Sequence, residues 1–72
     1  MQTASSQQTF SRLYEAIQEL PLSDLRYSLF DLWASFEEYE PQEALSRFDA
    51  NVGDLGAEAF DFWLSFSRAV AA

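Results

Sequence analysis

The sequence predicts an all-α fold, a small bundle of about four helices, on three observations. Apolar side chains recur every three or four residues along most of the chain, which is the period of one helix face. Pro21, Pro41 and Gly53 divide this pattern into four segments. The chain has 72 residues, which is the size of one domain. We therefore expect a flexible N-terminus over residues 1–8 and a single helical domain over residues 9–72.

The first predicted helix precedes Pro21. Ser5 and Gln8 have the spacing of a capping box, and Thr9 is an alternative N-cap. One helix face then collects the apolar residues Phe10, Leu13, Tyr14, Ile17 and Leu20. Pro21 ends the helix because a proline disfavours helical geometry in the residue before it.

The second predicted helix begins after Ser23, a good N-cap residue. Asp24 follows in the first turn, where the helix dipole favours an anion. Pro41 requires a break near Glu40, so we expect this helix to continue to about Tyr39. Its apolar arc comprises Leu25, Leu29, Leu32, Trp33 and Phe36.

The third predicted helix begins at Pro41, since proline suits the first helical turn, and Gly53 is its expected stop. Asp54 is the expected cap of a fourth helix. Residues 60–66 alternate between apolar and polar side chains as a strand does, but they fit a helix face equally well. The sequence offers no second strand to satisfy the backbone of a first one, so we predict a helix here.

An internal repeat is the most informative feature of the sequence. Residues 30–36, FDLWASF, match residues 60–66, FDFWLSF, at five of seven positions. Upstream, the triplet SRL at 11–13 resembles SRF at 46–48. The repeat predicts two similar helical hairpins, over 9–39 and 41–71, each burying its apolar face against the other. The alternative is chance similarity between two amphipathic helices of similar composition.

The charge balance restricts the kind of partner. Twelve Asp and Glu residues face four Arg and no Lys, which gives a net charge of −8. Nucleic acid and anionic membranes would repel such a chain, so we expect neither as a direct partner. A protein with a basic surface is the expected partner, and the alternative is that the charge only maintains solubility. No apolar run has the length of a membrane span, and no targeting segment is visible, so we expect a cytoplasmic protein.

The residue types present argue against an enzyme. The sequence contains no His, no Cys and no Lys, so the commonest acid–base groups, nucleophiles and metal ligands are missing. Carboxylate pairs at helical spacing, Glu15 with Glu19 and Asp54 with Glu58, are typical of a solvated face. We expect no catalytic residue, no cofactor and no metal ligand.

Residues 49–58 loosely resemble an EF-hand calcium loop between two helices. Such a loop needs an oxygen ligand at position 5, glycine at position 6 and glutamate at position 12. Counted from Asp49, these positions hold Gly53, Asp54 and Phe60. A linker rich in turn residues is therefore the favoured interpretation, and calcium binding is the alternative.

The first candidate binding surface is acidic. It consists of Glu37, Glu38, Glu40 and Glu43, which surround the bend at Pro41 and which we call the acidic corner. The corner follows the C-terminal end of a predicted helix, where the dipole disfavours anions, and this hints at a function. Asp31 and Asp61 would point outward and extend it, together with Asp49, Asp54 and Glu58. The alternative is an ordinary solvated bend.

The second candidate surface is apolar. On the fourth predicted helix, Phe60, Trp63 and Leu64 widen the apolar stripe to about half of the circumference. Such a helix is either central in the bundle or covered by a partner, which includes a second copy in a homodimer.

These observations predict a non-catalytic inhibitor or modulator that docks its acidic corner on a basic protein surface. Strongly basic surfaces commonly hold nucleic acid, so a DNA mimic is the sharpest form of this hypothesis. Phage anti-restriction and anti-CRISPR proteins are analogous in size and charge. The alternative is a structural or assembly module that self-associates or docks a partner helix through the aromatic face.

Overall fold

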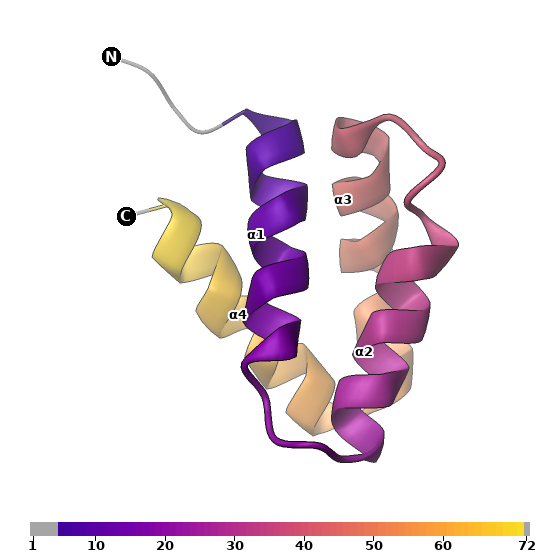
Figure 1. Cartoon of the computed structure of the whole chain (residues 1–72), viewed down its shortest axis with the longest axis vertical. Helices are drawn as coiled ribbons and strands as arrows, with labels where there is room; N and C mark the ends of the chain where they lie inside the picture. Colours follow the sequence, from indigo (N-terminus) through magenta and orange to yellow (C-terminus); the bar gives the residue numbers. More distant parts are fainter. Residues whose placement is uncertain (1–4, 72) are drawn as a thin grey trace.

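The computed structural model describes residues 5–71, which contain four α-helices and one short 3-10 helix. In chain order these are α1 (Ser6–Gln18), α2 (Asp24–Ser35), α3 (Pro41–Asn51), η1 (Val52–Leu55) and α4 (Ala57–Ala71). Within this described part there is no strand, and residues 60–66 lie inside α4, as predicted. In Figure 1, α1 and α2 run antiparallel, and α1 contacts each of the other α-helices.

The N-terminus of α1 carries the predicted capping box. The Ser5 hydroxyl accepts a hydrogen bond from the Gln8 backbone N–H at 3.1 Å, and the Ser5 N–H donates to Gln8 Oε1 at 3.4 Å. The helix therefore begins at Ser6, earlier than the predicted domain boundary at residue 9. Of the predicted flexible segment 1–8, residues 1–4 lie outside the described residues, and residues 6–8 are helical.

Helix α2 ends at Ser35 rather than near Tyr39. The chain then tightens, because the N–H groups of Phe36 and Tyr39 donate to carbonyls only three residues back, both at 3.1 Å. Glu37 and Glu38 would add negative charge at the negative end of the helix dipole, which disfavours further helical turns. The result is a turn over residues 36–39, exposed from Glu37 onward, where helix was predicted.

The junction before α4 also differs from the prediction. Gly53 does not stop α3, and Asp54 does not cap α4, since both lie within η1. The fully buried Val52 holds this segment against the core. Gly56 makes the turn instead, with a φ of 111° that favours glycine strongly. Its carbonyl accepts the N–H of Phe60 at 3.1 Å at the start of α4.

This difference between the two glycines predicts opposite effects of substitution. Gly56→Ala should lower the free energy of unfolding by about 1–3 kcal/mol, because a side chain is strained at positive φ. Gly53→Ala should leave it unchanged or raise it by up to about 1 kcal/mol, since its φ is not positive and the added Cβ meets nothing. Urea denaturation followed by circular dichroism measures both. Equal effects of the two substitutions would contradict the assignment of Gly56 as the turn.

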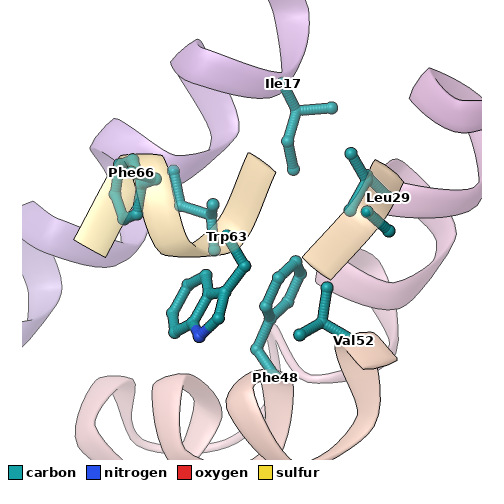
Figure 2. Close-up of a cluster of buried hydrophobic side chains, with 8 residues drawn as sticks. Ile17, Leu29, Phe48, Val52, Trp63 and Phe66 are labelled. Atoms are coloured by element: carbon teal, nitrogen blue, oxygen red, sulfur yellow. The ribbon is translucent and has the colours of Figure 1, made fainter. Parts of the chain in front are cut away.

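The core lies where α1, α2, α3, η1 and α4 converge (Figure 2). Phe48 is fully buried, and its ring centroid lies 5.0 Å from that of Trp63. The Trp63 indole N–H donates to Asp49 Oδ1 at 2.6 Å, so its polar atom is satisfied at the edge of the core. The other members labelled around this pair are Ile17, Leu29, Val52 and Phe66.

The structure does not confirm two equivalent hairpins. Helix α3 contacts α1 and α2 more extensively than it contacts α4, and η1 lies between α3 and α4. Figure 1 shows α4 crossing behind α1 rather than running beside α3. The two repeated tryptophans also differ in burial, since Trp63 is buried and Trp33 is half-buried.

Candidate protein-binding site

The acidic corner forms one exposed bend between α2 and α3. Glu37 and Glu38 lie in the turn after α2, Glu40 occupies the N-cap position of α3, and Glu43 lies in its first turn. All four side chains are exposed. In Figure 1 this bend is at the upper right, at the opposite end of α2 from the α1–α2 connection.

The electrostatic setting of the corner is more favourable than predicted. Only Glu37 and Glu38 follow the C-terminal end of a helix. Glu40 and Glu43 lie at the N-terminus of α3, where the helix dipole stabilises negative charge. Local helix stability therefore explains Glu40 and Glu43, and only the other two carboxylates lie where the dipole disfavours them.

Arg47 neutralises part of the corner. Its Nε donates to Glu43 Oε2 at 2.7 Å, one helical turn away, and its guanidinium lies 4.5 Å from the centroid of the Tyr39 ring. The Arg47 and Glu43 side chains are 46% and 52% exposed, so solvent screens the pair and limits it to about 1 kcal/mol or less. Within residues 5–71, Glu43 is therefore paired, whereas Glu37, Glu38 and Glu40 make no ion pair.

Asp31 and Asp61, which were predicted to extend the acidic corner, do not lie together beside it. Asp61 is exposed, but it lines a shallow depression with Leu20, Leu25 and Glu58, near the N-terminal end of α2. The corner follows the other end, and twelve residues of helix span about 18 Å. Asp31 is exposed on α2, between these two regions.

The predicted aromatic face is only partly available. Phe60 is 42% exposed and Leu64 is half-buried, so both contribute to the surface of α4. Trp63 is only 8% exposed and is hydrogen-bonded to Asp49. Trp63 is therefore a core residue, which corrects its assignment to a docking face. Trp63 is buried because it lies on the same side of α4 as the buried residues Ala59 and Phe66.

Residues 49–58 do not form one continuous loop between two helices. They comprise the end of α3, η1, Gly56 and the start of α4, and Asp49 accepts the Trp63 indole N–H. Within residues 5–71, no three His, Cys, Asp or Glu side chains lie close enough together to hold a metal ion. None of the helices in the same range has the length and hydrophobicity needed to cross a membrane.

A groove that was not predicted from the sequence lies beside the acidic corner. It lies between α1 and the turn after α2, and its walls include Phe10, Trp33, Glu37, Tyr39 and Pro41. The tertiary fold brings Phe10 to Trp33, and no local pattern predicts that contact. The Glu43–Arg47 pair, in contrast, has the i,i+4 spacing of a helical ion pair and was visible in the sequence.

Comparison with protein-family models, with curated proteins and with solved structures found no match to this chain.

Proposed function

We propose that this chain is a non-catalytic inhibitor or modulator that docks its acidic corner on the basic surface of another protein. The observation that carries the proposal is the placement of four exposed glutamates on one bend of a chain with net charge −8. A basic surface that normally holds nucleic acid fits best, so the chain would act as a DNA mimic. Phage anti-restriction and anti-CRISPR proteins are the analogy in size and charge, and we propose a cytoplasmic location.

The physical basis is complementarity of charge. Carboxylates on a protruding turn can accept charge-assisted hydrogen bonds from Arg and Lys side chains of a partner. Such contacts raise the association rate and exclude acidic competitors, and salt weakens them. No acid–base or nucleophilic step is required of the chain, which agrees with its lack of His, Cys and Lys.

The test is capture of the partner from a lysate of the native host at low salt, followed by elution with a salt gradient and mass spectrometry. We expect a nucleic-acid-handling protein that elutes at moderate salt and competes with DNA or RNA for this chain. A partner whose affinity is unchanged between low and high salt would overturn the proposal.

A second proposal is an assembly module that associates through α4. It is supported by Phe60, which is exposed, and by Leu64, which is half-buried and lies one helical turn further along α4. A homodimer or a partner helix covering them would give salt-insensitive association and a melting temperature that rises with protein concentration. A monomer whose melting temperature does not change with protein concentration would exclude this alternative.

We further propose that the repeated segments arose by duplication. Each repeat tryptophan packs on a phenylalanine of the α-helix that precedes its own, Trp33 on Phe10 and Trp63 on Phe48, although the repeat matches Phe48 with Leu13 rather than with Phe10. Each also donates its indole N–H to an oxygen of that same helix. The second tryptophan is buried and the first is half-buried, so the two copies would have diverged after the duplication.

A further inference from the structure

We propose that the groove beside the acidic corner receives an arginine side chain of the basic partner. The groove combines aromatic walls, Trp33 and Tyr39, with one carboxylate, Glu37. Glu37 is the charged residue among those that line it within residues 5–71. This inference rests on the proposed function and assigns a specific anchor to it.

Contacts with α1 fix the orientation of the Trp33 ring. Its indole N–H donates to the Phe10 carbonyl at 2.9 Å, so the one polar atom of the ring is satisfied. Its ring stacks on Phe10 with centroids 4.5 Å apart and planes 14° apart, and Tyr14 lies against it at 4.8 Å. The ring therefore has a fixed orientation where it lines the groove, and binding need not immobilise it.

The Tyr39 ring is the second wall. It is 42% exposed and packs edge-on against Phe36, with centroids 6.0 Å apart. Tyr39 and Glu37 lie in the same turn, so one bound side chain can contact an aromatic face and a carboxylate together.

The same bend already binds a guanidinium from within the chain. Arg47 lies over Tyr39 at 4.5 Å while its Nε donates to Glu43 at 2.7 Å. One aromatic ring and one carboxylate thus hold one arginine. The groove offers the same combination of groups, with Trp33 as the aromatic ring and Glu37 as the carboxylate.

The expected cation is arginine rather than lysine. The planar guanidinium stacks on aromatic rings and forms forked hydrogen bonds with carboxylates, whereas an ammonium is a compact and strongly hydrated charge. The charge of the chain, −8, favours any basic segment. The aromatic walls supply the preference between the two cations.

The test is a titration of the isotope-labelled full chain followed by NMR. The probes are two peptides of equal charge, Arg-Gly and Lys-Gly repeats of the same length. The chain has two tryptophans, so its two indole N–H signals report on the groove and on the core in one experiment, and Trp33→Phe identifies which is which. We expect the arginine peptide to shift the Trp33 signal, to leave the Trp63 signal in place, and to bind about two- to five-fold more tightly than the lysine peptide.

Variants sharpen the test without touching the core. Glu37→Gln should weaken binding of the arginine peptide about two- to five-fold. Glu19→Gln removes the same charge at the far end of α1 and should have a smaller effect. If the amides of Glu38, Glu40 and Glu43 shift while the Trp33 indole does not, the corner binds cations and the groove assignment is wrong. If no signal moves with either peptide at low salt, the proposed function fails together with the groove.

Discussion

Phe48→Ala is expected to remove a large part of the stability of the domain. Phe48 is fully buried between Trp63, Val52 and their neighbours (Figure 2). Removing such a ring costs about 3–5 kcal/mol, through the transfer free energy of the ring and the cavity left behind. A chain of 72 residues is expected to have a stability of roughly 4–11 kcal/mol in total. Loss of helical circular dichroism at 25 °C, or a sharply lower urea midpoint, is the measurement.

Phe60→Ala is the matched control, because it removes the same side chain from a site that is 42% exposed. We expect a loss below about 1 kcal/mol in the monomer, as for most surface substitutions. A loss comparable to that of Phe48→Ala, with a melting temperature that depends on concentration, would show that Phe60 is buried by association. That outcome would favour the assembly module over the acidic inhibitor.

The helices were predictable because local chemistry determines them. The Ser5–Gln8 capping box and the place of Pro41 at the start of α3 each depend on a single helical turn. Both are found as expected. Residues 60–66 were correctly predicted as helix, because the sequence offers no second strand to pair with a first one. The turn after Ser35 and the junction at Gly56 were not predicted. The turn depends on the carboxylates of Glu37 and Glu38 at the negative end of α2, and the junction depends on which glycine takes a positive φ.

The candidate site was predictable only in part, for the same reason. The exposure of Glu37, Glu38 and Glu40 follows from their position at a proline bend. The burial of Trp63 depends on its contact with Phe48 of α3, and the groove at Trp33 depends on the contact of that ring with Phe10 of α1. Both are contacts between helices. The repeat made the two tryptophans look equivalent, although only one of them reaches the surface groove.

The combined substitution of Glu37, Glu38 and Glu40 by Gln should weaken binding of the captured basic partner about ten- to a hundred-fold. Each exposed carboxylate that pairs with a cation of the partner contributes up to about 1 kcal/mol, and removing three neighbouring charges together gives that range. These side chains are exposed and make no ion pair within residues 5–71, so the fold should be unaffected. Isothermal titration calorimetry at two salt concentrations measures the affinity and its salt dependence.

Two controls separate a local effect from net charge. Replacing Glu15, Glu19 and Asp54 by their amides removes the same three charges from exposed positions outside the corner, and it should weaken binding only slightly. In the opposite direction, Arg47→Gln frees Glu43 and should strengthen binding, whereas Arg68→Gln at the end of α4 changes the net charge equally and should not. If both triple variants weaken binding equally and both arginine variants act alike, the partner senses the overall charge. The acidic corner would then have no special role, because long-range attraction depends on total charge and a docking site depends on where the charges lie.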